Sequence, residues 1–442
     1  MSADQPADLP ADLPADVPAD CDVVVVGAGL AGLTCARSLQ AAGLDVRVLE
    51  ASPEVGGRVR TEEVDGHLVD VGFQLLNPSY PAVRRHIDVD ALRLAPFAAG
   101  VHARLDSGPV VLGDPRRAPR LLRGTAAAGL PRLREALPLL RWAAPALAPS
   151  RDLPGRVRRR RPDRSLQEAL DASGVRGDLR RVLEAFVAGV VLDDTGLTAE
   201  QMVLLVIRSF LAGTPSLPAD GMRALPRQLA APLGDRVRTS TPVHDVGPGR
   251  VRTGEGTVRA RTVVLAAGPG AAAGLLDRPA PAVRGVVTQW WSAPADTIAH
   301  AAGGGLLRVD ARSRPTGPLV NTSVVTGAAA SCAPEGRHLV AASALMRPDA
   351  PAPTRDEMLR HAGELLESPT GSWEEVARHE VAEALPAATA PLDVRAPQRV
   401  ADGLLVCGDH RDTPSIQGAM VSGERAAAAV LAGLTGPRRA GS

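Results

Sequence analysis

The chain has 442 residues, 45% of them hydrophobic, which is more than one ordinary domain holds, so two domains are expected. The formal net charge of +1 excludes a global field that would steer the whole protein toward nucleic acid or a membrane. All 50 basic residues are arginine, and this excludes any mechanism that needs a lysine.

Cysteine, histidine and hydropathy patterns exclude further classes of protein. The four cysteines form no CxxC pair, which fits reduced thiols, and we expect a cytoplasmic protein. The nine histidines show no spacing typical of metal ligands, so no metal site is predicted. No apolar run reaches the roughly 18 residues that a membrane span needs.

The first elements in chain order predict a strand, a glycine turn, a helix and a second strand. Residues 1–20 repeat proline, alanine and aspartate, which predicts a disordered acidic tail. The β-branched run Val23–Val26 is typical of a strand buried on both faces of a parallel sheet. A helix is expected over Leu30–Ala42, with Gly43 as its stop, and a second strand over Leu44–Leu49.

The turn between the first strand and the helix reads GAGLAG and fits the dinucleotide-binding pattern G-x-G-x-x-G. Gly27 permits the tight turn, Gly29 lets the backbone approach a pyrophosphate, and Gly32 lets the helix pack on the strand. Glu50 ends the next strand and can bind a ribose diol, and its charge disfavours a 2′-phosphate. Whether NAD or FAD binds stays open at this point. The other residues of the turn are Ala28, Leu30 and Ala31.

The stretch LEASPEVGGRVRT over 49–61 resembles a second motif of the flavin amine oxidase and phytoene desaturase-like superfamily. The resemblance implies FAD. Arg58 in this motif would hold the pyrophosphate through its forked guanidinium.

The resemblance continues toward the carboxyl terminus. VDVGFQLLNPSYP at 69–81 resembles the segment beside the flavin ring, and 216–230 resembles a helix start in which Asp220 replaces a glycine. TPV at 241–243 resembles the strand whose valine contacts the adenine. LLVCGDHRDTPSIQGAMVSGERAA at 404–427 resembles a strand ending in Gly-Asp and a helix that begins at the pyrimidine edge. The further cofactor-binding residues so implied are Ala51, Gly57, Arg58, Gly72, Phe73, Val243, Gly408, Asp409, Gln417, Gly418 and Ala419.

The expected fold class is α/β, with a Rossmann-type, glutathione reductase-like FAD-binding domain built from discontinuous segments and an inserted α+β substrate domain. We assign 21–85, 236–280 and 396–436 to the FAD-binding domain. The substrate domain then comprises 86–235 and 281–395, with a helical part over about 114–216.

The expected chemistry is hydride removal from a C–H bond of a small to medium apolar or amine substrate to flavin N5, in an oxidase or a desaturase. His410 is a candidate proton donor or acceptor, or binds only the turn backbone. Gln74, and more weakly Asn321, offers an amide to the flavin or satisfies only backbone. In a strand, Trp290 and Trp291 point to opposite faces, so Trp290 is a candidate for the substrate cavity or packs in the core.

Two other functions remain open at this stage: a flavin-dependent isomerase without net redox turnover, and an FAD-binding partner protein without catalysis. Arginine is concentrated in residues 114–164, which hold 14 arginines and four acidic residues, a net charge of +10. This segment either contacts a membrane surface weakly or forms a solvated cap. Nucleic acid is not expected, because stacking aromatic residues are missing.

Overall fold

The computed structural model describes residues 19–114, 117, 119–121, 123–124, 126, 133–147, 163–298 and 305–435. Its first sheet is built on five parallel strands in the order β19-β12-β1-β2-β9. Their bounds are β1 Cys21–Val26, β2 Val46–Leu49, β9 Val237–Arg238, β12 Gly256–Leu265 and β19 Leu404–Val406. The valine run lies at the centre, where strands on both sides and layers on both faces bury it.

Both faces of this sheet are covered. Val23 and Val25 pack in the cluster that includes α1 (Leu30–Ala41) and α12 (Ile416–Thr435). Val24 and Val26 pack with α10 (Pro269–Leu275) and with β10 (Val243–Gly247) and β11 (Arg250–Thr253), an antiparallel extension of β12. A further short strand, β18 (Arg399–Ala401), pairs with β19.

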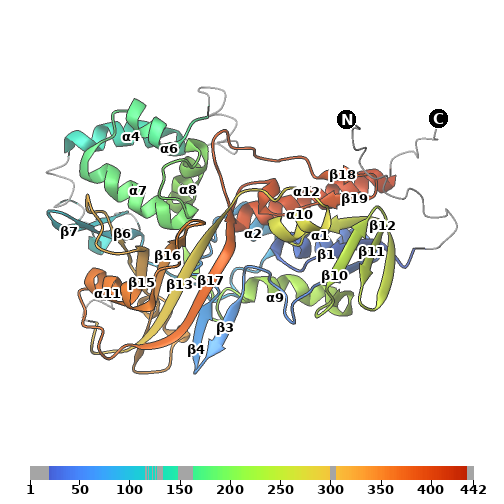
Figure 1. The fold of residues 1–442 in the computed structure, drawn as a ribbon, viewed down its shortest axis with the longest axis horizontal. Helices are drawn as coiled ribbons and strands as arrows, with labels where there is room; N and C mark the ends of the chain where they lie inside the picture. Colours follow the sequence, from blue (N-terminus) through green and yellow to red (C-terminus); the bar gives the residue numbers. More distant parts are fainter. Residues whose placement is uncertain are drawn as a thin grey trace, which may run out of the picture.

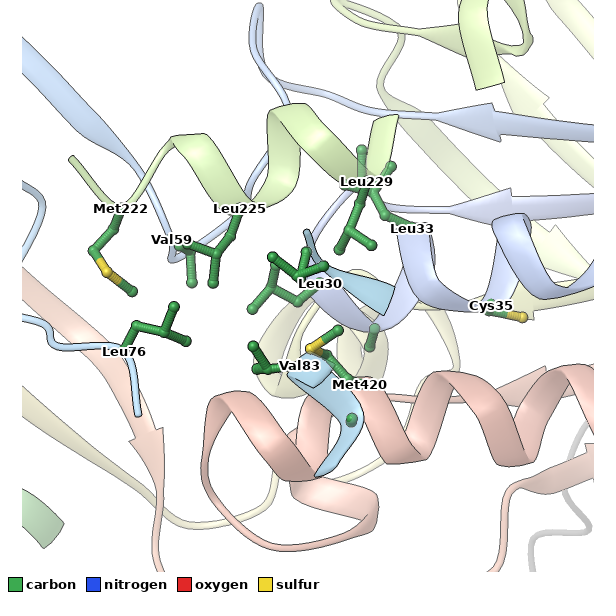
Figure 2. Close-up of a cluster of buried hydrophobic side chains, with 14 of the residues drawn as sticks. Leu30, Leu33, Cys35, Val59, Leu76, Val83, Met222, Leu225, Leu229 and Met420 are labelled. Atoms are coloured by element: carbon green, nitrogen blue, oxygen red, sulfur yellow. The ribbon is translucent and has the colours of Figure 1, made fainter. Parts of the chain in front are cut away.

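A buried hydrophobic cluster packs α2 (Pro81–His86) and α9 (Ala224–Ala230) against α1 and α12 (Figure 2). It includes Leu225 and Leu229 of α9, Leu30 and Leu33 of α1, and Met420 of α12, with α2 beside them. Helix α9 thus packs on α1, although the sequence placed its residues in the substrate domain. The domain boundaries themselves stay predictions.

The second sheet has seven strands in the order β17-β13-β16-β15-β14-β6-β7 (Figure 1). Trp290 and Trp291 on β13 lie in different hydrophobic clusters, which confirms that they point to opposite faces. Helix α11 (Arg355–Leu366) packs on the face of Trp291. The strand bounds are β6 Gly100–Leu105, β7 Gly108–Gly113, β13 Val283–Pro294, β14 Leu307–Asp310, β15 Leu319–Val324, β16 Arg337–Met346 and β17 Glu374–Pro386.

A group of helices lies over one end of this sheet (Figure 1). It consists of α4 (Leu133–Leu147), α6 (Leu166–Ala172), α7 (Gly177–Val191) and α8 (Glu200–Ala212), which share one hydrophobic cluster. Helix α7 contacts β6, β14, β15 and β16, so it forms the inner layer of the group.

Short pieces complete the described chain. These are the strand pairs β3 (Thr61–Val64) with β4 (His67–Asp70) and β5 (Ala95–Pro96) with β8 (Ser216–Leu217), and the 3-10 turns η1 (Pro119–Leu121), η3 (Ala231–Arg236), η5 (Val325–Gly327), η6 (Ala330–Cys332) and η7 (Asp409–Arg411).

The amino-terminal and arginine-rich segments are described only in part. Residues 1–18 of the predicted tail lie outside the described residues. Asp20, also assigned to the tail, is instead joined to the sheet, because its backbone N–H donates to the Arg259 carbonyl at 2.9 Å. Most of 115–132 and all of 148–162 also lie outside. Among the helices that the structure describes, none has the length and apolar character needed to cross a membrane.

Candidate functional site

The carboxyl ends of four parallel strands meet at one edge of the first sheet. Just beyond the strand ends, the Gly27 N–H donates to the Leu49 carbonyl at 2.8 Å and the Cys407 N–H donates to the Leu265 carbonyl at 2.9 Å. In open α/β sheets, ligands bind at this edge, beyond the strand ends. Every predicted cofactor motif that follows a strand therefore opens onto the same side of the sheet.

The three glycines of the first turn differ in how much space the protein leaves for a side chain. A Cβ on Gly27, whose φ is +105°, would lie 2.6 Å from the Ala266 oxygen, and a Cβ on Gly32 would lie 2.0 Å from the Gly27 oxygen. A Cβ on Gly29 would meet only the Gly56 oxygen, at 4.0 Å. Protein packing thus requires glycine at two of the positions, whereas at Gly29 the space is free for a ligand.

The second glycine turn lies directly against the first. The Gly56 N–H donates to the Ala28 carbonyl at 2.8 Å, and a Cβ on Gly57 would lie 3.4 Å from the Cα of Gly29. Helix α1 begins after Gly29, and no side chain caps it. Its first N–H groups and its dipole therefore remain available to an anion.

Glu50 closes the other side of the first turn. Its buried carboxylate accepts the Ala28 N–H at 2.7 Å and the Ser52 N–H at 2.8 Å, one on each oxygen. Each carboxylate oxygen keeps further acceptor capacity. The Glu50 carbonyl accepts the Thr241 N–H at 2.8 Å, which brings Val243, at the start of β10, to the same region as the exposed Ala51.

Arg58 and Asp409 form an ion pair between the second glycine turn and the carboxyl-terminal motif. The Arg58 guanidinium donates to Asp409 at 2.6 Å and to the Ala384 carbonyl at 3.1 Å. Asp409 is buried, whereas about a third of the Arg58 side chain remains exposed. Sequence reasoning proposed each residue for the cofactor, but it did not predict that they pair across 351 positions.

His410 is held next to this pair in a partly desolvated position. Burial lowers the pKa of its imidazole to about 4, so the ring is neutral at pH 7. Its buried Nδ1 has no hydrogen-bond partner in the described structure, so this nitrogen does not bind the turn backbone. A buried polar atom without a partner needs a physical explanation, and a ligand bound beside it supplies one.

Helix α12 begins at Ile416, one residue before the expected start. The Ser415 hydroxyl accepts the Gly418 N–H at 3.0 Å and caps the helix. A Cβ on Gly418 would lie 1.8 Å from the Thr413 oxygen, so glycine is required there. The Gln417 side chain turns to α2, where it accepts the Ala82 N–H at 2.9 Å. Ala419 continues the same first turn.

The segment expected beside the flavin ring connects the two sheets. At Gly72 the chain turns with φ +87°, and the Phe73 N–H donates to the Thr288 hydroxyl of β13 at 3.4 Å. The Phe73 ring packs edge-on against Trp290, with 6.3 Å between the ring centroids. Gln74 donates to the carbonyls of Arg58 and Val71 at 2.8 and 3.1 Å, so its amide nitrogen satisfies backbone.

Two further candidate polar groups are buried on the second sheet. Trp290 is 1% exposed, and its indole N–H has no partner in the described structure. Asn321 on β15 is also buried and its Oδ1 has no partner there, while its amide nitrogen packs under Gly189 of α7.

Sequence reasoning missed two polar residues that fix the backbone near the predicted motifs. The buried Ser422 hydroxyl accepts the Gly408 N–H at 3.0 Å and so fixes the turn before Asp409. Asp70 binds the Thr61 hydroxyl at 2.5 Å and the Met222 N–H at 3.1 Å, and burial raises its pKa to about 7. Both residues lie in segments that resemble the family, 69–81 and 404–427, but the sequence indicated no role for either, because their contacts with Met222 and Gly408 form only in the folded chain.

The residues present fit a bound FAD. The free space at Gly29, the uncapped helix behind it and the buried Glu50 suit a diphosphate and a ribose diol. The unpartnered His410 nitrogen lies beside the ion pair, at the end where the resemblance places the flavin's ribityl chain. The individual contacts of these residues with FAD stay predictions.

Comparisons with known proteins agree with this geometry. The family model described as "Flavin containing amine oxidoreductase" matches residues 30–431. A putrescine oxidase from Kocuria rosea is 49% identical over 67 residues, which are 15% of this chain and 14% of that protein. The curated relative is thus matched over only a small part of its length.

Solved structures match over nearly the whole chain. Cyclohexylamine oxidase from Brevibacterium oxydans has a TM-score of 0.65 at 17% identity, covering 94% of this chain and 99% of that one. A putative protoporphyrinogen oxidase from Exiguobacterium has a TM-score of 0.67 at 18% identity, covering 93% and 99%. These likenesses show the fold, and the family match shows the membership. The chain belongs to the flavin-containing amine oxidoreductase family, and its cofactor is FAD.

Proposed function

We propose that this protein is an FAD-dependent oxidase or desaturase that removes a hydride from a C–H bond of a small to medium apolar or amine substrate. The observation that carries the proposal is the contact of Phe73 with Thr288 and Trp290. It connects the cofactor edge of the first sheet to a buried face of the second sheet that carries an unpartnered N–H group.

Residues at both ends of the chain would hold the cofactor. Gly29 and the start of α1 would receive the pyrophosphate, with Arg58 as its cation, and Glu50 would bind the ribose. Gly408 and Asp409 would contact the ribityl region, and Gln417–Ala419 the pyrimidine edge. When bound, the flavin supplies a two-electron acceptor for the substrate's hydride.

The chain's own groups would position the substrate and exclude water. Phe73, Phe97 and Trp290 form a continuous aromatic cluster, with ring centroids 6.0 and 6.3 Å apart. The Trp290 N–H would donate to a substrate acceptor. His410 is neutral at pH 7, so its unpartnered Nδ1 would carry either a proton that it can donate or a lone pair that can accept one, depending on the tautomer.

Electron-acceptor consumption tests the proposed reaction. The purified holoprotein is incubated with amines, amino acids and polyenes in the presence of oxygen or a redox dye. We expect one two-electron equivalent of acceptor to be consumed for each product molecule. Product formed without acceptor consumption would instead identify an isomerase, and a flavin that no compound reduces would favour a non-catalytic FAD-binding protein.

Two neighbouring tryptophans give a matched pair of variants. Trp290→Phe removes the unpartnered N–H on the site face, whereas Trp291→Phe changes a ring that packs on Trp373, 6.0 Å away, on the opposite face. We expect the first substitution to lower kcat/KM and the second to leave it near the wild-type value. Equal effects would contradict the assignment of the Trp290 face to the substrate.

A further inference from the structure

Helix α4 exposes two leucines on its outer face. Leu137 is 52% exposed and Leu140 is 59% exposed, and within the described chain only Leu197 is a comparably exposed large hydrophobic residue. Arg134, Arg141 and Ala144 on the same helix are exposed as well. The FAD-dependent reaction proposed above gives this face no role.

Polar contacts on the inner face fix how α4 is rotated. The Trp142 N–H donates to the buried Glu200 carboxylate at 2.9 Å, and the Glu135 carboxylate accepts the Leu179 N–H at 2.9 Å, near the start of α7. Trp142 and Ala146 are buried against α8 and its neighbours. The helix cannot turn its leucines inward without breaking both hydrogen bonds.

The helical period places the leucines opposite these contacts. At about 100° per residue, Glu135, Trp142 and Ala146 lie within roughly 20° of one direction. Leu137, Leu140 and Ala144 lie about 140–200° away from that direction, and Arg134 and Arg141 lie along one flank of the leucines. The outer face therefore presents an apolar stripe with a cationic border.

The surrounding sequence carries the same charge. Residues 114–164 have a net charge of +10, with 14 arginines, and α4 lies in the middle of this segment. Apolar side chains flanked by arginines match a bilayer whose headgroups are anionic, because the leucines enter the acyl boundary while the arginines reach the phosphates.

We propose that the outer face of α4 binds the surface of an anionic lipid bilayer. In Figure 1, α4 lies in the helical group over the second sheet, at the opposite end of the molecule from the first sheet. Docking through α4 therefore brings the second sheet and its helices to the bilayer and leaves the first sheet away from it. Because no described helix can span a membrane, the contact is peripheral.

Vesicle flotation of the full-length holoprotein tests the proposal. The vesicles contain phosphatidylcholine either alone or with phosphatidylserine, at low salt and at about 1 M salt. The variants are Leu137→Gln/Leu140→Gln and Arg134→Gln/Arg141→Gln, with Leu197→Gln as the matched control. Glutamine has a helix propensity close to those of leucine and arginine, so neither pair of substitutions weakens the helix through propensity. An unchanged flavin absorbance spectrum shows that each variant is folded.

We expect the wild-type protein and Leu197→Gln to float only with vesicles that contain phosphatidylserine. The leucine pair should lower the partition coefficient at least about tenfold, since two apolar side chains lose their burial. The arginine pair should lower it roughly tenfold at low salt, and high salt should release all proteins because it screens the charges.

Three results would overturn the proposal. The first is a wild-type protein that does not float at low salt, and the second is a leucine-pair variant that binds as well as the wild type. The third is a wild-type protein that sediments as a dimer without lipid while the leucine-pair variant sediments as a monomer. That result would show that a second copy of the chain covers this face.

Discussion

Substitution of Gly29 by alanine separates the requirements of the cofactor from those of the fold. Gly29 has φ −75° and ψ 176°, a conformation that alanine adopts without strain. The added Cβ would meet only the Gly56 oxygen, at 4.0 Å. The protein itself therefore leaves room for a methyl group, and only a ligand at the start of α1 would clash with it.

A small effect on stability and a large effect on FAD affinity follow from this geometry. In the apoprotein, alanine reduces the freedom of the unfolded chain but caps a helix less well than glycine, so we expect the unfolding free energy to change by less than about 1 kcal/mol. For FAD, a methyl group against the pyrophosphate should cost about 1–3 kcal/mol, as overpacking does, which raises Kd roughly 5- to 150-fold.

The assay combines denaturant unfolding of the apoprotein with titration of FAD followed by flavin fluorescence. Gly32→Ala is the matched control, because its Cβ would lie 2.0 Å from the Gly27 oxygen. We expect that control to destabilise the apoprotein by about 1–3 kcal/mol or more. A Gly29→Ala protein that binds FAD with wild-type Kd would refute the placement of the pyrophosphate.

Three further predictions concern ionisable side chains in buried or partly buried positions. Burial lowers the pKa of His410 from 6.5 to about 4, so between these pH values the unfolded chain binds a proton that the folded chain does not. The unfolding free energy should therefore decrease as the pH falls from about 6.5 to about 4. His410→Gln should flatten that part of a pH series of urea titrations. Burial raises the pKa of Asp70 from 3.8 to about 7, so the unfolding free energy should decrease as the pH rises between these values and the buried carboxyl loses its proton. Asp70→Asn, which stays neutral, should be more stable than the wild type at pH 8 but not at pH 3, as measured by thermal unfolding. Arg58→Ala leaves the buried Asp409 without its ion-pair partner and should destabilise the apoprotein by about 1–3 kcal/mol in denaturant, a loss that the additional change Asp409→Asn should partly restore.

Local patterns predicted the cofactor half of the fold. The valine run, the helix from Leu30 and its glycine stop occur where they were expected, with α1 ending at Ala41 and Gly43 at φ +85°. Such patterns succeed because the strand, the turn and the helix each depend on residues that are neighbours in the sequence. The glycine motif also consists of neighbouring residues, so it predicted the dinucleotide-binding turn without any knowledge of tertiary contacts.

The other half of the site depends on contacts between distant segments. Gln417 binds Ala82, and Thr288 contacts both Phe73 and the Ser343 hydroxyl, which lies 3.3 Å away on the adjacent strand. Strand pairing brings these residues together, and no spacing rule in one sequence reports it. For the same reason, Gln74 fitted a flavin-facing role in the sequence, although its amide nitrogen binds two backbone carbonyls.

Anaerobic reduction of the bound flavin tests the central claim most directly. The purified protein is mixed without oxygen with single amines, amino acids and polyenes, and the absorbance of the oxidised flavin is followed in a stopped-flow instrument. We predict that at least one class of compound bleaches the flavin, more slowly in Trp290→Phe than in Trp291→Phe. A stoichiometric FAD that dithionite reduces but no compound of the panel bleaches would contradict the proposed oxidoreductase function.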